Sequence, residues 1–384
     1  MDFLLDYGSF LLKAVTVVVA IIFVVGTIIS LKQRSKSGSA EGHLVIKKLN
    51  DELDDYKEDL EIELYSEAEL KLMDKERKKA EKEKEKAEKK RVKEKVKEAK
   101  NAAKTEEKSE LLAADDEAEV EDEMAEGDEP EDRKKRVYVL DFNGDVQASE
   151  TELLRHEITA VLTMASAQDE IVLRLESPGG MVHSYGFAAS QLARIRNKQI
   201  PLTICVDHVA ASGGYMMASI ANKIVAAPFA VVGSIGVVAT LPNFNKVLKK
   251  YDVDYEQFTA GEYKRTVTMF GENTTKAKEK FQADLEDTHV LFKQHINQYR
   301  PDLNVEDVAT GEIWYGSQAL AKGLIDEVGT SDDYIVEACK NADVYSVRYE
   351  FKKTLQEKLG LAAQAGVEKA ALRIFTLIQR KNVM

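Results

Sequence analysis

The sequence predicts an α/β protein with a largely parallel sheet, preceded by one transmembrane helix and a charged spacer. Three observations lead to this prediction. After residue 136, short apolar segments typical of buried strands alternate with amphipathic helical segments. Near the N-terminus lies an uncharged apolar run that is long enough to cross a bilayer. Between these two regions the chain consists mainly of Lys, Glu and Ala, followed by an acidic run.

The apolar run covers residues 14–31. As a helix it would be roughly 27 Å long, close to the hydrocarbon thickness of a bilayer. We expect the transmembrane anchor over residues 10–32, because the amine of Lys13 can reach the membrane surface. A cleaved signal peptide is the alternative. Asp2 and Asp6 replace its usual basic start, and the run exceeds a usual signal-peptide core, so we predict an uncleaved single-pass anchor.

A charged linker, partly helical and partly disordered, is expected over residues 33–135. Only weak helix is predicted within residues 41–73. Residues 74–108 contain many Glu/Lys pairs at helical spacing but no apolar seam, which indicates a solvated helix rather than a coiled coil. Residues 115–132 are acidic and have the composition of a disordered segment. A solvated spacer is the simplest interpretation, and a docking segment for a partner or the membrane surface is the alternative.

The globular domain is expected over residues 136–345, followed by a C-terminal helical segment over residues 346–384. Strands are predicted in "RVYVLDF", "EIVLRLE", "PLTICVD", "KIVAAP" and "VVGSIGVVAT". Helices are predicted in "ELLRHEITAVLTMAS" and "SYGFAASQLARIRN", and "SGGYMMASIA" begins another. Alternation of this kind predicts a parallel sheet with helices on its faces.

Composition excludes several classes of function. The net charge of −13 argues against a general affinity for nucleic acid. Two cysteines, Cys205 and Cys339, cannot form a disulfide framework, and Cys205 lies in an apolar run that predicts a buried strand. No C-x-x-C or H-E-x-x-H spacing occurs, so we expect neither a metal ion nor a cofactor.

The segment "VAASGGYMMA", residues 209–218, contains a candidate nucleophile. Ser212 follows a predicted strand and stands at the start of an apolar helix, among small residues that allow a substrate backbone to approach. Free backbone N–H groups at a helix start favour an oxyanion. An ordinary serine N-cap is the alternative interpretation.

A second turn, "ESPGGMV" at residues 176–182, directly follows a predicted strand. Pro178 fixes one backbone dihedral, and the glycines permit conformations that other residues resist. Such a turn can direct the Gly180 amide at a bound carbonyl, and the chain beyond it can pair with an extended peptide. A tight strand-to-helix turn is the alternative.

A serine nucleophile needs a base, which histidine or lysine can supply. His208 is the best-placed histidine, but only Asp207 is near enough in sequence to orient it. Lys264 lies in "TAGEYKRTVTMFGENT", residues 259–274, a loop that becomes apolar. A lysine acts as a base only when neutral, which burial promotes. Taken alone, this loop is more simply interpreted as a surface loop.

In this order, the motifs "SPGG", "AASGGY", "GSIGV" and "AGEYK" resemble the bacterial Ser/Lys signal peptide peptidase family, over about residues 136–345. With one catalytic copy and an N-terminal anchor, the chain is most similar to the single-copy branch. The resemblance implies that Ser212 is the nucleophile. It implies that Lys264, 52 residues later (264 − 212 = 52), is the base and that Ser234 orients this lysine.

The resemblance also implies an oxyanion hole formed by the backbone amides of Gly179 or Gly180, and of Gly213. The segment at residues 311–330 is similar to a structural part of the wider ClpP/crotonase-like fold. Family members assemble into rings in which neighbouring chains supply the serine and the lysine. We therefore expect peptide or protein substrates, a bacterial inner-membrane location and a homo-oligomer.

Two observations give opposite indications about the side of the membrane on which the catalytic domain lies. Lys32, Arg34 and Lys36 follow the anchor, which by the positive-inside rule favours a cytoplasmic catalytic domain. The family resemblance favours the periplasm, which we take as the expectation. Two other functions stay open: a crotonase-like acyl-CoA enzyme, in which Ser212 and Lys264 have no ready role, and an inert membrane scaffold acting through its charged linker.

Overall fold

The computed structural model describes residues 42–79, 82–83, 86 and 133–351. The predicted anchor, most of the highly charged run and the chain after residue 351 lie outside this part. Among the described residues, no helix combines the length and the apolar character needed to cross a bilayer.

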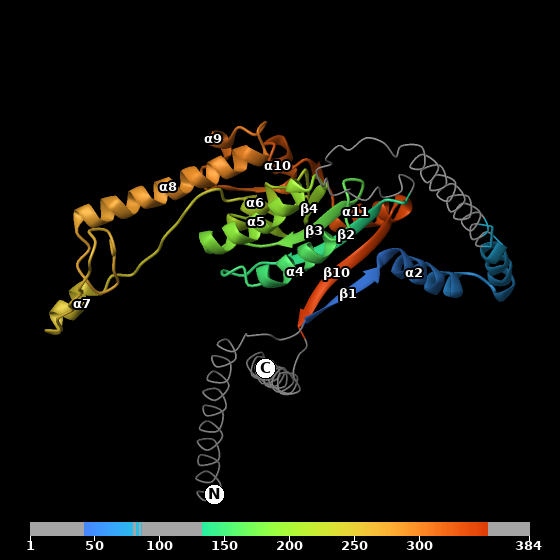
Figure 1. Cartoon of the computed structure of the whole chain (residues 1–384), viewed down its shortest axis with the longest axis horizontal. Coiled ribbons are helices and arrows are strands. Elements are labelled where there is room, and N and C mark those ends of the chain that lie inside the picture. Colours follow the sequence, from blue (N-terminus) through green and yellow to red (C-terminus); the bar gives the residue numbers. More distant parts are fainter. Residues whose placement is uncertain (1–41, 80–81, 84–85, 87–132, 352–384) are drawn as a thin grey trace, which may run out of the picture.

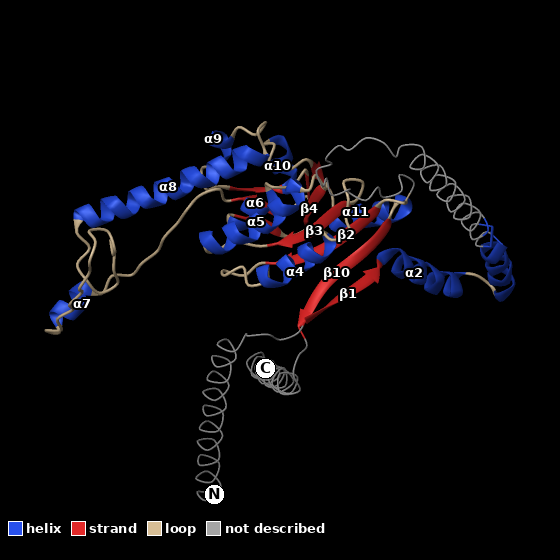
Figure 2. Cartoon of the chain, viewed as in Figure 1, coloured by secondary structure: helices blue, strands red, loops and turns tan. Residues whose placement is uncertain are grey.

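A seven-stranded mixed sheet forms the centre of the molecule (Figure 2). Every neighbouring pair is parallel except β1 and β10, which are antiparallel. In spatial order the strands are β1 (Gly42–Lys48), β10 (Asp343–Phe351), β2 (Arg136–Asn143), β3 (Glu170–Glu176), β4 (Leu202–Val206), β6 (Lys223–Ala226) and β9 (Glu327–Val328). The prediction of an α/β fold is confirmed.

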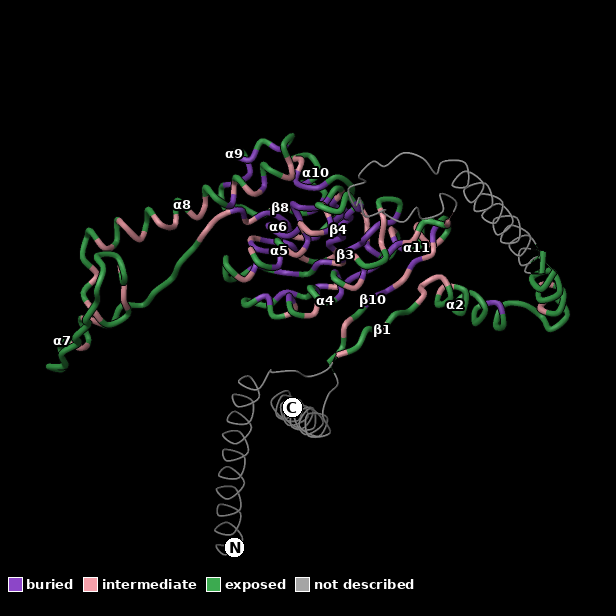
Figure 3. Tube along the Cα trace, viewed as in Figure 1, coloured by how far each residue is buried: buried purple, intermediate pink, exposed green. Residues whose placement is uncertain are grey.

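Helices cover both faces of this sheet, and the strands show the expected two-residue alternation. Leu140 and Phe142 of β2 belong to the larger core, beneath α4 (Thr151–Val161), α5 (Val182–Asn197) and α6 (Gly213–Ala218). Val137 and Val139 point to the other face, where α11 (Ser331–Asn341) covers a smaller core. Figure 3 shows that burial is concentrated in these layers.

A second, three-stranded sheet carries the predicted nucleophile region. It consists of β5 (Val209–Ala211), β7 (Val231–Gly233) and β8 (Ile313–Tyr315), with β5 parallel and β8 antiparallel to β7. A single bridge between Ser177 and Ala210 joins β5 to the end of β3. The segment "VVGSIGVVAT" is a strand only to Gly233, because the chain then turns away with Ser234 at φ 51°.

A long arm extends from the body. It contains α7 (Asn245–Lys250) and α8 (Thr275–Tyr299), and Figure 1 shows α7 far from the central sheet. In α8 only Phe292 and Ile296, near its C-terminal end, are buried. Two short helices, α9 (Val305–Val308) and α10 (Gly316–Ala321), lead back to the sheet.

The folded part of the chain extends into both segments that flank the predicted domain. Within the expected linker, residues 42–48 form β1 and α2 (Leu49–Leu64) follows directly. At the other end, β10 continues to Phe351, into the segment predicted to be helical. The residues of β1 are half-buried or exposed, and the strand pairs over its whole length with a strand at the far end of the chain. This distant pairing, which no local pattern indicates, is what fixes the strand.

The side chain of Asn50 fastens α2 to the body. Its Nδ2 donates to the carbonyl oxygens of Cys339 and Ala342, each at 3.0 Å, and its Oδ1 accepts the Val344 amide at 2.8 Å. An asparagine that satisfies three backbone groups in this way fixes the position of the helix.

Candidate active site

Ser212 stands at the junction between β5 and α6 in an unusual backbone conformation. Its φ is 53° and its ψ is −117°, a combination that costs a non-glycine residue on the order of 1–3 kcal/mol. The backbone amide donates to the Gly233 carbonyl at 2.8 Å, and the carbonyl accepts the Met216 amide at 2.9 Å. The side chain makes no capping hydrogen bond, so the interpretation as an ordinary N-cap does not hold. The hydroxyl is left available for chemistry.

The Ser-Pro-Gly-Gly turn packs directly against this junction. A Cβ on Gly179, whose φ is +88°, would lie 2.7 Å from the Ala211 carbonyl oxygen and 2.8 Å from the Gly213 nitrogen. A Cβ on Gly180 would lie 2.2 Å from the Val146 carbonyl oxygen. Both positions therefore require glycine, and the turn and the nucleophile loop touch each other.

The two glycine amides of the turn differ in their hydrogen bonding. The Gly179 amide donates to Ser177 Oγ at 3.1 Å. The amides of Gly180 and Gly213 have no acceptor among the described residues. Of the two glycine amides in the turn, only that of Gly180 is therefore free to donate to a further acceptor.

A small pocket opens beside Ser212. Its volume is about 260 Å³, part of it open to solvent. The lining is mainly apolar or glycine, from the turn, α6, the chain after β7, and α8: Gly180, Val182, Ser212, Gly213, Met216, Gly236, Val237, Thr288 and Phe292. The pocket therefore places a mainly apolar surface beside the Ser212 hydroxyl.

Ser234 directly follows Gly233, whose carbonyl accepts the Ser212 amide. Its own amide donates to the Glu312 carbonyl at 2.6 Å. The Ser234 hydroxyl has no hydrogen-bond partner within the described part of the chain.

Lys264 is not brought to Ser212 within one chain. It is exposed, in the segment that joins α7 to α8 (Figure 1). Its loop is held at the first turns of α8, where Glu262 pairs with Lys276 at 2.6 Å. The pocket instead uses Thr288. These two positions on α8 are twelve residues apart (288 − 276 = 12), about 18 Å along the helix.

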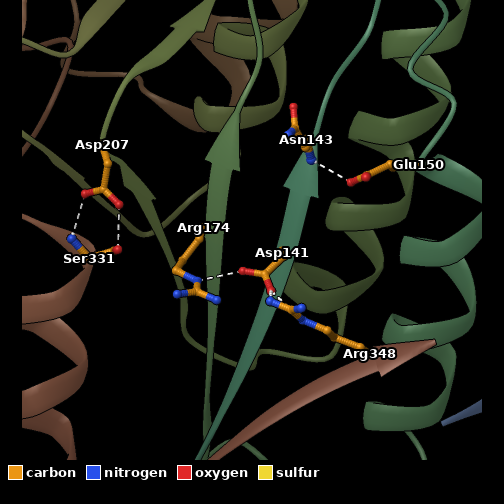
Figure 4. Close-up of polar contacts among 7 residues, drawn as sticks. All are labelled: Asp141, Asn143, Glu150, Arg174, Asp207, Ser331 and Arg348. Carbon is orange, nitrogen blue, oxygen red and sulfur yellow. Dashed lines mark hydrogen bonds and ion pairs between the residues drawn. The ribbon is translucent and has the colours of Figure 1, made fainter. Parts of the chain in front are cut away.

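The histidine alternatives do not form a catalytic pair with Ser212. His208 is exposed, and the Asp207 carboxylate accepts the Ser331 amide at 2.8 Å and the Ser331 hydroxyl at 2.5 Å (Figure 4). Asp207 thus holds the start of α11 and does not orient His208. His295 Nε2 lies 2.9 Å from the Met216 carbonyl oxygen, and burial lowers the pKa of this imidazole.

Sequence reasoning missed two buried hydroxyls behind the turn. Ser177 Oγ lies 2.6 Å from the Tyr185 hydroxyl, which donates to the Asp145 carbonyl at 2.7 Å. Ser177 belongs to the quoted turn and Tyr185 to the quoted helix, but no local pattern indicates that they meet.

Comparison with known proteins identifies the family. The peptidase family S49 N-terminal model matches residues 2–192, and the peptidase family S49 model matches residues 194–345. The chain is 50% identical over 364 residues to the probable protease SohB of Haemophilus influenzae, covering 94% of each chain. It is also 50% identical over 242 residues to the probable protease SohB of Buchnera aphidicola subsp. Acyrthosiphon pisum, covering 63% of this chain and 72% of that one.

The chain therefore belongs to peptidase family S49, and it is similar to the SohB proteases within that family. The predicted resemblance is confirmed. A solved mutant of the 1510-N membrane-bound stomatin-specific protease, in complex with a substrate peptide, aligns with a TM-score of 0.37 and 17% identity. It covers 59% of this chain and 96% of that one, a similarity too low to support an argument about this site.

Proposed function

We propose that this protein is a membrane-anchored serine endopeptidase in which Ser212 is the nucleophile and Lys264 the general base. The observation that supports it best is the geometry at Ser212. A hydroxyl free of capping bonds, on a strained junction, lies beside a small pocket and the unpaired amides of Gly180 and Gly213. The substrates are peptides or unfolded, membrane-associated protein segments.

In the proposed reaction, Ser212 Oγ attacks the scissile carbonyl while neutral Lys264 Nζ accepts the hydroxyl proton. The amides of Gly180 and Gly213 donate to the oxyanion. The Lys264 ammonium then gives its proton to the departing amine as the C–N bond breaks. Water then attacks the acyl-enzyme while Lys264 Nζ accepts one of its protons. The bond between the acyl carbon and Ser212 Oγ breaks, and the Lys264 ammonium returns the proton to Ser212 Oγ. The Ser234 hydroxyl orients the amine of Lys264.

Because Lys264 lies on the arm, we propose that a neighbouring chain supplies it and that the enzyme is a homo-oligomer. Many apolar side chains of the arm are exposed in the single chain, which supports a covering partner. They are Val238, Leu241, Phe244, Val247, Tyr251, Val253, Tyr255, Phe258, Tyr263, Met269 and Phe270. Packing against a second chain would also remove water from the amine of Lys264.

The pocket beside Ser212 supports a preference for small or medium apolar side chains at the residue before the cleaved bond. Its lining offers no charged group to a substrate side chain, and it is mostly apolar or glycine. We further assign the domain to the ClpP/crotonase-like fold and place it at the inner membrane, on the periplasmic side. A reporter fused after residue 136 tests this orientation: periplasmic reporter activity supports it, and cytoplasmic activity contradicts it.

The central test uses a serine-reactive fluorophosphonate on the full chain in mild detergent. Labelling and peptide hydrolysis should both be lost in Ser212→Ala. Lys264→Arg should be inactive as well, since a guanidinium does not deprotonate. A crotonase-like enzyme or an inert scaffold would show no Ser212-dependent labelling. Substantial turnover by purified Lys264→Arg would contradict the assignment of the base.

Mixing experiments test the shared site. Inactive Ser212→Ala and Lys264→Ala chains are dissociated, mixed and reassembled, with each variant reassembled alone as the control. Mixed oligomers should regain part of the activity, because some sites then combine an intact serine with an intact lysine. No recovery in verified mixed oligomers would mean that each chain completes its own site.

A further inference from the structure

We propose that the Tyr185 hydroxyl, acting through Ser177, is a positioning group that holds the Gly180 amide ready for the oxyanion. This inference rests on the proposed function, because it assigns a role to two buried residues behind the same site. Neither residue touches substrate in this proposal. Their effect is to fix which amide of the turn faces inward and which faces the reacting carbonyl.

In the hydrogen bonds behind the turn, the donor and the acceptor of each bond can be assigned. The Asp145 carbonyl can only accept, so the single proton of Tyr185 goes to it, at 2.7 Å. In the 2.6 Å contact between the two hydroxyls, Ser177 must therefore be the donor. Ser177 Oγ then accepts from the Gly179 amide at 3.1 Å. Every proton in this chain of bonds has one assigned acceptor, and the bonds reinforce one another.

The chain of bonds is sealed from solvent. Ser177 and Tyr185 both have 0% exposure. A Cβ on Gly144 would lie 2.5 Å from both of their side-chain oxygens. There is therefore no room for a water molecule on that side to replace a lost hydroxyl, and deletion of one hydroxyl leaves its partner unsatisfied.

Tyr185 also contacts the other half of the oxyanion hole. A Cβ on Gly213 would lie 2.4 Å from Tyr185 Cγ, so the ring packs directly against this glycine. One side chain thus supports the turn through its hydroxyl and the residue after the nucleophile through its ring. These two supports can be separated experimentally, because phenylalanine keeps the ring and removes only the hydroxyl.

Ser177 connects the turn to the strand that carries the nucleophile. Its amide donates to the Val209 carbonyl at 2.8 Å, and its carbonyl accepts the Ala211 amide at 3.0 Å. With its backbone fixed to β5, Ser177 holds the peptide between Pro178 and Gly179 through its side chain, and the Met181 amide holds the other end of the turn by donating to the Val146 carbonyl at 2.8 Å. The peptide between Gly179 and Gly180, which carries the Gly180 amide, lies between these two points. If Tyr185 no longer holds the Ser177 side chain, the first point is lost and this peptide can rotate, since glycines allow it.

The test compares Tyr185→Phe, Ser177→Ala and the double variant with the wild type, as full chains in detergent. Tyr334→Phe is the matched control. It removes a hydroxyl that donates to Glu170 at 2.5 Å on the opposite face of the sheet. Three quantities are measured: kcat and KM for peptide hydrolysis, the inhibition constant of a peptide aldehyde that adds to Ser212, and the affinity of an uncleaved peptide in the Ser212→Ala background.

Removing an oxyanion donor commonly lowers kcat by about 10²–10³-fold, so a misdirected donor should lower it by about 10–100-fold. We expect that loss in Tyr185→Phe and in Ser177→Ala, with KM within about twofold. Aldehyde affinity should fall by the same factor, because the adduct uses the same amides. Peptide affinity should not change, and the double variant should be no worse than the worse single variant. Tyr334→Phe should keep wild-type kinetics.

Wild-type kcat and aldehyde affinity in Tyr185→Phe would overturn the inference. So would a loss that is matched by weaker peptide binding, since a merely structural role predicts that both fall together. Additive losses in the double variant would also contradict it. Failure of the proposed function is a separate result: it appears as hydrolysis that persists in Ser212→Ala, whatever Tyr185→Phe does.

Discussion

The buried carboxyl of Glu157 should make the free energy of unfolding depend on pH by an amount that can be calculated. Glu157 lies on α4 and is only 5% exposed. Its Oε1 accepts the Tyr349 amide at 2.8 Å, and its Oε2 has no partner among the described residues. Burial, with smaller effects of Asp141 and Glu150, raises its pKa from 4.5 to about 7. The folded protein therefore holds the Glu157 proton more tightly than the unfolded chain does.

This difference sets both the sign and the size of the effect. Below pH 4.5 the carboxyl is protonated in both states and its contribution is fully present. As the pH rises from 4.5 to about 7, the unfolded chain loses this proton while the folded protein keeps it. The free energy of unfolding therefore falls over this range. A shift from 4.5 to about 7 corresponds to a loss of about 3 kcal/mol, at 1.36 kcal/mol per unit.

Glu157→Gln tests this directly, because glutamine keeps the acceptor for Tyr349 and stays neutral at every pH. The free energy of unfolding is measured by urea denaturation at steps from pH 5 to pH 9. Relative to the wild type, Glu157→Gln should gain stability between about pH 5 and pH 8, approaching about 3 kcal/mol. Glu152→Gln, an exposed change on the same helix, is the control and should show no such gain. Parallel pH profiles for Glu157→Gln and the wild type would refute the reasoning.

Three further predictions concern the site and its surroundings. Val237→Phe should narrow the pocket. Measured with peptides that differ only in the residue before the cleaved bond, kcat/KM for leucine at that position should fall by about tenfold relative to kcat/KM for alanine. If the leucine-to-alanine ratio does not change, the substrate side chain binds elsewhere. Gly180→Ala should abolish hydrolysis, because its Cβ would lie 2.2 Å from the Val146 carbonyl oxygen, and near-normal activity would contradict the described turn. Because burial lowers the pKa of His295, stability should fall as the pH drops below about 6.5, and thermal melting of His295→Gln should show a smaller fall on this acid side than the wild type.

Much of the fold was predictable because its signals are local. The strands β2, β3 and β4 are mainly apolar and mostly buried, as expected for strands covered on both faces, and helical segments lie between them in the sequence. The strand β1 was not predictable, since its hydrogen-bonding partner lies at the other end of the chain. All of its residues are half-buried or exposed, so what holds the strand in place is its pairing with β10.

In the candidate site, too, some residues could be predicted from local motifs and others could not. Ser212 and the glycines of the turn are placed by short motifs, and the structure brings them together. The roles of Ser177 and Tyr185 depend on a contact between two elements, which spacing alone does not reveal. The place of Lys264 depends on the arm, whose apolar side chains have no cover in a single chain. Its role in the site stays a prediction.

The pairing of β1 with β10 determines what a cut in the charged region would do. Seven residue pairs, from Gly42 opposite Phe351 to Lys48 opposite Tyr345, join the two strands, and Asn50 adds three more backbone contacts. A cut between residues 87 and 132 interrupts the covalent path but leaves all of these contacts in place. The two fragments would then stay associated as a split protein, held together by these contacts alone. For the same reason, a recombinant fragment should begin at residue 42: one beginning at 136 would leave the whole edge of β10 open to pairing with other chains.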